Sequence, residues 1–178
     1  MDKNLFLIPL NGLSHGRMTS SMKVGKEFFE SFENSEILDA DLLIGVETEK
    51  SGQYIGIDCH ISGTVSVACD RCLEPLTVPV ETEARLSVKF GTGGEDDGDE
   101  DSSSDREIVW LPEDNTDFDL AQVIYDYVCL SLPLLRMHPE GECNPQVMRY
   151  IRSGISVSDA ENAGPDSPFA ALKGLFGN

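Results

Sequence analysis

Two cysteines with two residues between them, Cys69 and Cys72, are the clearest chemical signal in the sequence. Two thiols at this spacing in a turn can bind one metal ion or form one redox pair. Further along the chain, His138 and Cys143 have four residues between them and offer a second close pair of ligands. A structural zinc site commonly combines two such pairs in a tetrahedron. These four residues are therefore the candidate ligands of a structural zinc ion.

Other interpretations of this cluster stay open. Its three thiols can be reduced and free of metal, which is the main alternative to zinc. A typical zinc knuckle has a glycine shortly after the second cysteine, whereas Leu73 and Glu74 follow here. A redox dithiol of the thioredoxin type lies at the start of a helix, where the helix dipole lowers a thiol pKa, but this motif lies between two strand patterns. A metal-dependent enzyme would need an open coordination position and a polar cleft beside the cluster.

The elements that must position the first pair of thiols are two long alternating segments. Apolar residues occupy the odd positions from Ile55 to Cys69 and the even positions from Leu76 to Phe90. A period of two is typical of a strand with one buried face, and Gly63 marks a bend in the first segment. Together the two segments predict an antiparallel hairpin with Cys69 and Cys72 at its tip.

Shorter patterns predict the rest of the fold. We expect strands at residues 5–10, 40–46 and 108–111, and helices at 25–32, from 119 to the residues before Pro133, and at 145–151. Asp119 and Gln122 have the spacing of a capping box, in which two side chains satisfy free backbone N–H groups at a helix start. The predicted fold class is α+β. It has a mainly antiparallel sheet, a meander that includes the long hairpin, packed with two or three helices.

Length and composition indicate how this fold is organised. The chain has 178 residues, of which 40% are hydrophobic and 25% are charged, so one α+β domain over residues 1–153 is expected. Seven of the eleven residues from 95 to 105 are acidic and the others are Gly or Ser, which predicts a disordered loop. Residues 154–178 are expected to form a flexible C-terminal tail that includes a short apolar patch.

Charge and cysteine content exclude some classes of protein. The formal net charge of −19 argues against a general binder of DNA or other polyanions, because such binding depends on Lys and Arg. Five cysteines in a chain of this size do not resemble a disulfide framework, and Cys59 and Cys129 fall on apolar faces as small core residues. No stretch approaches the roughly 20 apolar residues that span a bilayer. We expect a cytoplasmic protein.

Five motifs stand out along the chain: Cys69–Pro75, Ser87–Gly91, Asp119–Gln122, Leu130–Pro133 and His138–Cys143, with an acidic gap after the second. Together they resemble the YceD-like family, whose members are linked to the accumulation of large-subunit ribosomal RNA. Segments near both ends of the chain are also similar to that family, so the resemblance covers nearly the whole sequence. One departure is the tail, where glycines replace further lysines and argue against a basic end that contacts RNA.

The resemblance implies a bacterial cytoplasmic factor in assembly or processing of the large ribosomal subunit, with no known set of catalytic residues. We therefore expect a non-enzymatic protein that binds pre-ribosomal RNA or a basic ribosomal protein. An acidic chain suits a basic partner because opposite potentials steer their encounter, and the loop 95–105 would then imitate RNA. The alternatives are a metal-binding enzyme and a CxxC thiol redox protein. The sequence specifies no oligomeric state.

Overall fold

The computed structural model describes residues 6–10, 16–33, 35–51, 54–91 and 105–153. The chain divides into two compact units, Met1–Met137 and His138–Asn178. The expected acidic loop, apart from Asp105, and the expected tail lie outside the described residues, so both stay predictions. No helix in the described part of the chain is long and apolar enough to cross a membrane.

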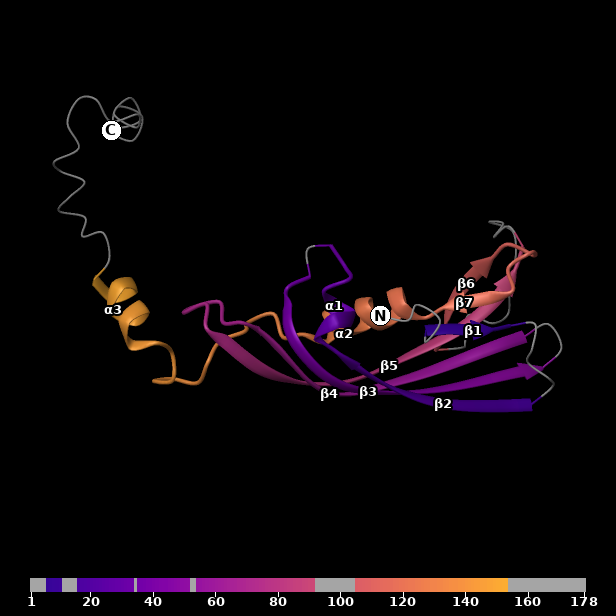
Figure 1. The fold of residues 1–178 in the computed structure, drawn as a ribbon, viewed down its shortest axis with the longest axis horizontal. Coiled ribbons are helices and arrows are strands. Elements are labelled where there is room, and N and C mark those ends of the chain that lie inside the picture. The colour runs from indigo at the N-terminus through magenta and orange to yellow at the C-terminus, as the bar shows by residue number, and fades with distance from the viewer. Residues whose placement is uncertain (1–5, 11–15, 34, 52–53, 92–104, 154–178) are drawn as a thin grey trace, which may run out of the picture. The chain divides into compact units, whose positions relative to one another are not determined.

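The first unit is built on an open five-stranded sheet with the strand order β2-β3-β4-β5-β6 (Figure 1). The strands are β2 (Gly16–Gly25), β3 (Ile37–Ser51), β4 (Tyr54–Ala68), β5 (Pro75–Phe90) and β6 (Glu107–Leu111). β2 to β5 form an antiparallel meander, whereas β6 runs parallel to β5. A two-stranded antiparallel sheet pairs β1 (Leu7–Pro9) with β7 (Asp117–Asp119). Three helices complete the described elements: α1 (Lys26–Phe29), α2 (Ala121–Ser131) and, in the second unit, α3 (Pro145–Ser153). The α+β prediction is confirmed.

The long hairpin predicted from the alternating pattern is the β4–β5 pair. The ladder ends where Ala68 pairs with Pro75, so the cysteines follow directly at its tip. Ile57 and Cys59 are buried, while Asp58 and His60 lie on the opposite face of the sheet. The hydrophobic pattern alone was sufficient to predict which side chains of the hairpin are buried. A shift of the strand pairing by one residue would turn every apolar side chain of the strand to solvent.

The edge strand β2 is an element that the sequence pattern did not predict. It pairs along ten residues with β3, which is itself longer than the predicted strand at 40–46. β2 lies at the edge of the sheet and pairs with a neighbour on one side only. Val24 is its only buried side chain, and most of its other residues are exposed. Without a clear apolar alternation an edge strand has little local signature, and pairing with a neighbour decides its conformation.

One face of the sheet is covered by α1 and α2, which Figure 1 shows above the strands. Phe28 and Phe29 of α1 are fully buried, and Tyr125 of α2 stacks on Phe32 with 4.2 Å between the ring centroids. Ile124 of α2 is also buried in the same core. The helices therefore cover the apolar face of the meander and leave the polar face of β3, β4 and β5 facing away from the core.

The start of α2 matches half of the predicted capping box. Asp119 Oδ1 accepts a hydrogen bond of 2.8 Å from the Ala121 N–H, as expected for a capping carboxylate. Gln122 instead donates to Asp126 at 2.8 Å along the helix, so the reciprocal bond to the backbone of Asp119 was wrongly predicted. At the other end, Leu132 is extended, which is the conformation favoured before a proline.

Candidate metal centre

The tip of the β4–β5 hairpin holds Cys69 and Cys72 in a tight turn within the first unit. The Cys69 N–H donates to the Glu74 carbonyl at 2.9 Å, and the Leu73 N–H donates to the Cys69 carbonyl at 2.9 Å. Cys69 is 0% exposed and Cys72 is 4% exposed, and neither is in a disulfide. The pairing of the two strands thus places both thiols, buried and reduced, in one small turn.

The residue after the second cysteine takes the backbone conformation that a glycine takes in a typical zinc knuckle. Leu73 has φ of 63°, and it is the one non-glycine residue with positive φ in the described part of the chain. Its side chain is 76% exposed and contributes little packing. The absence of glycine at this position therefore does not prevent the knuckle turn, and the leucine stores backbone strain beside the cysteines.

Leu73→Gly is expected to raise the free energy of unfolding by up to about 1 kcal/mol, because glycine adopts positive φ without a steric penalty. Denaturant unfolding of the reduced protein measures this change. Glu74→Gly is the matched control, since Glu74 has no positive φ, and it should lower stability slightly. A clear loss of stability in Leu73→Gly would contradict the strain at this turn.

The chain that leads to the second pair of ligands is anchored on this same turn by Arg136. The Asp70 N–H donates to the Arg136 carbonyl at 2.7 Å, and the Arg136 N–H donates back to Asp70 Oδ2 at 2.7 Å. The guanidinium of Arg136 also contacts Glu36, with Nη1 and Oε2 2.5 Å apart. The Glu36 carboxylate, and to a smaller extent Asp70, raises the pKa of Arg136. These contacts hold residue 136 beside Asp70, between the two cysteines.

No pattern in the sequence predicted this anchor. Asp70 and Arg136 are 66 residues apart, and Glu36 and Arg136 are 100 apart. No local pattern links residues at such separations. One sequence signal points toward the anchor: the Asp-Arg pair between the two cysteines. It indicates that the turn carries charged side chains, but it does not indicate which residue they contact.

His138 and Cys143 flank a short turn at the start of the second unit. The Glu142 N–H donates to the Pro139 carbonyl at 3.1 Å, and Gly141 has φ of 93°. Cys143 is 5% exposed. Next to it, the Asn144 side chain caps α3 by accepting a 2.9 Å hydrogen bond from the Gln146 N–H. This local structure folds the His138–Cys143 segment back on itself and fixes where the helix begins.

Cys69, Cys72, His138 and Cys143 form what we call the Cys/His group. Their ligand atoms all lie within 4.8 Å of one another. In a tetrahedral zinc site with Zn–S bonds of ~2.3 Å, two sulfurs are separated by about 3.8 Å. Three thiols and an imidazole are also ligands that zinc binds in structural sites. The group is therefore consistent with metal binding.

The remaining cysteines and histidines lie elsewhere. Burial raises the pKa of the Cys59 thiol to about 12, and it also raises the pKa of the partly buried Cys129. Both pack in or against the core, as expected from the sequence. His60 lies on the polar face of the sheet, with Nδ1 3.6 Å from Glu83 Oε1. His15 is outside the described residues.

Comparison with known proteins gives one family. The model of the family described as large ribosomal RNA subunit accumulation protein YceD matches residues 57–176. This range contains all four residues of the Cys/His group. A search of curated proteins and a search of solved structures returned no match.

Proposed function

The chain belongs to the YceD family of large ribosomal RNA subunit accumulation proteins, and we propose that it acts as a non-enzymatic cytoplasmic factor in assembly of the large ribosomal subunit. It would do so by binding pre-ribosomal RNA or a basic ribosomal protein. The observation that carries this proposal is the family match, which spans most of the hairpin, its cysteine turn, α2 and most of the second unit.

We further propose that the Cys/His group binds one structural zinc ion. Four protein ligands complete a tetrahedral shell and leave no position for water or a substrate, whereas a catalytic zinc keeps one position open. Thiolates and imidazole favour zinc over magnesium or calcium, which prefer oxygen. The ion would join two pairs of residues that are 66 to 74 positions apart in the sequence and so add to the stability of the fold.

The environment of the CxxC turn supports a structural role over a redox role. Cys69 follows a strand and Cys72 is followed by the strained Leu73 and by β5, so neither thiol lies at the start of a helix. The dipole that lowers a thiol pKa in thioredoxin-type motifs is therefore missing at this position. Both side chains are also buried, which hinders the approach of a substrate disulfide.

Depletion of this protein in its native host is expected to lower the amount of large-subunit ribosomal RNA relative to small-subunit RNA. Electrophoresis of total RNA measures the ratio, and sucrose gradients show whether free large subunits fall with it. Re-expression of the wild-type chain should restore the ratio. An unchanged ratio after complete depletion would contradict the proposed function.

A further inference from the structure

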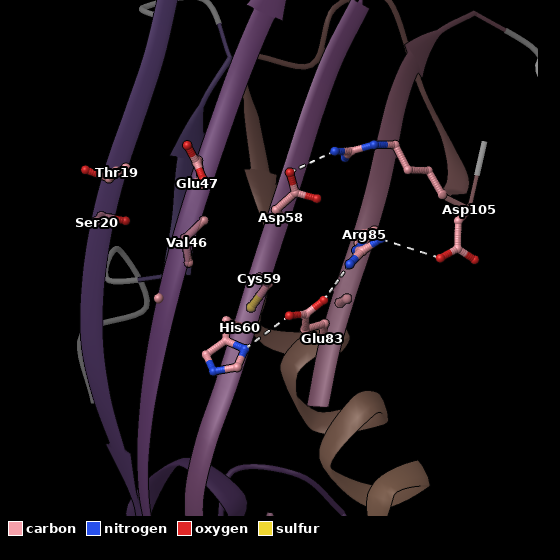
Figure 2. A pocket seen from close by; sticks show the side chains of 13 residues that line it. Thr19, Ser20, Val46, Glu47, Asp58, Cys59, His60, Glu83, Arg85 and Asp105 are labelled. Atoms are coloured by element: carbon pink, nitrogen blue, oxygen red, sulfur yellow. Dashed lines mark hydrogen bonds and ion pairs between the residues drawn. The ribbon is translucent and has the colours of Figure 1, made fainter. Parts of the chain in front are cut away.

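The polar face of the five-stranded sheet carries an open depression of about 650 Å³, separate from the Cys/His group (Figure 2). Strands β2, β3, β4 and β5 all contribute to it, together with the two residues that precede β6. We call this depression the sheet groove. Its charged lining residues are Glu47, Asp58, Glu83, Arg85, Asp105 and Arg106.

A glycine in the middle of β3 keeps the groove open. Gly45 pairs with Ser21 on one side and with His60 on the other. A Cβ built on Gly45 would meet no atom within 4 Å, and Gly45 is not among the glycines with positive φ. Neither backbone conformation nor packing within the protein therefore requires glycine here. Since glycine weakens a strand interior and often marks the close approach of a ligand or another backbone, its presence points to an occupant of this space.

The arginines of the groove are already engaged by carboxylates. Arg106 Nη2 lies 2.8 Å from Asp58 Oδ2. Arg85 contacts both Glu83, at 2.8 Å, and Asp105, at 3.5 Å. Figure 2 shows Asp58 on β4, Glu83 and Arg85 on β5, and Asp105 on the segment before β6. Neither guanidinium is left to neutralise a phosphate without breaking a contact that it already makes.

The carboxylates outnumber the cations in this lining. Glu47, Asp58, Glu83 and Asp105 supply four negative charges, against Arg85 and Arg106 in the lining and Arg17 of β2, which pairs with Glu47. The charged groups of the groove therefore keep a net negative charge, which favours an incoming cation over a phosphate.

We propose that the sheet groove binds an extended, lysine- and arginine-rich segment of a partner protein. This inference rests on the proposed function and selects, from its two kinds of partner, a basic protein over RNA. Positive side chains would approach over Gly45 and meet the carboxylates of β3, β4 and β5, whereas the same carboxylates repel phosphate. Asp105, the last residue of the acidic run 95–105, lies in the groove lining, and its charge adds to the attraction of such a segment.

The test uses the full-length protein and two fluorescent probes, a synthetic Lys/Arg-rich peptide and a single-stranded polyuridine of similar length. Fluorescence anisotropy gives the dissociation constant of each. Gly45→Lys places a positive side chain in the groove where no atom obstructs its Cβ. Gln122→Lys, at an exposed position of α2, adds the same charge away from the groove and is the matched control. Thermal unfolding checks that both variants fold as the wild type does.

The wild type is expected to bind the peptide, with an affinity that falls as salt rises. Gly45→Lys should weaken this binding by about tenfold or more, the effect of losing one or two close charge pairs, while Gln122→Lys changes it little. Equal peptide binding by Gly45→Lys and the wild type would overturn the inference. Binding of polyuridine in preference to the peptide, or a loss of peptide binding only when residues 95–104 are deleted, would also overturn it.

The same variant separates failure of this inference from failure of the proposed function. In the depleted host, Gly45→Lys is expected not to restore the ratio of large- to small-subunit RNA, whereas Gln122→Lys restores it. If depletion lowers the ratio and Gly45→Lys restores it fully, the groove inference fails and the proposed function stands. If depletion leaves the ratio unchanged, the proposed function fails, and only the peptide affinities bear on the groove.

Discussion

Replacing both Cys69 and Cys72 with serine is expected to abolish binding of the zinc ion that we propose and to lower the free energy of unfolding by about 5 kcal/mol or more. Structural zinc contributes ~10–16 kcal/mol to the folding of small zinc-binding peptides, and here a separate hydrophobic core carries part of the fold. The two thiols are buried at the hairpin tip, where serine hydroxyls bind zinc poorly. Metal analysis by mass spectrometry on protein purified without chelator or nickel affinity resin measures the ion, and denaturant unfolding measures the stability.

Cys129→Ser is the matched control for this variant. Cys129 is a free cysteine outside the Cys/His group and is partly buried on α2, so its replacement should leave about one zinc per chain. Thiol alkylation adds a second readout: zinc should protect Cys69, Cys72 and Cys143, and a chelator should expose them to the reagent. A wild type that holds no zinc after growth in zinc-supplemented medium would contradict the metal centre and favour three reduced thiols.

Gly63→Ala is expected to cost about 3 kcal/mol or more of stability, because the backbone of a neighbouring strand occupies the place of the new methyl group. Gly63 lies in β4 with φ of 143°, a conformation that L side chains rarely adopt. A Cβ there would lie 2.2 Å from the carbonyl oxygen of Asp41 and 3.0 Å from Cα of Leu42. A side chain could rotate away, but this obstacle is main chain held in the β3–β4 ladder. Urea unfolding measures the loss.

Gly45→Ala on the adjacent strand is the control that separates steric conflict from the general effect of glycine. Since nothing lies within 4 Å of its Cβ, the substitution should be neutral or stabilise the protein by up to about 1 kcal/mol. Equal effects of the two substitutions would contradict the close approach of β3 and β4 at Gly63. The pair of variants also shows that the two glycines serve different purposes, one for backbone approach and one for an open surface.

Local patterns predicted the hairpin with good boundaries. The apolar alternation predicted strands at 55–69 and 76–90, and the structure has β4 at Tyr54–Ala68 and β5 at Pro75–Phe90. Both strands bury one face over a long stretch, so the pattern repeats many times. The parallel pairing of β6 with β5 had no such signal, because β6 is short and the direction of a strand is set by the chain that leads to it.

The amino-acid sequence by itself determined which side chains of the hairpin face the core, and it also singled out four Cys and His residues as candidate metal ligands. Strand periodicity and ligand chemistry are properties of residue types and short spacings, so both can be recognised without coordinates. The tertiary structure alone decided that β2 forms the edge of the sheet, that Arg136 is anchored on Asp70, and that Gly45 lies beneath an open, acidic groove. Each of these features depends on contacts between residues far apart in the chain, and such contacts exist only after the strands have paired.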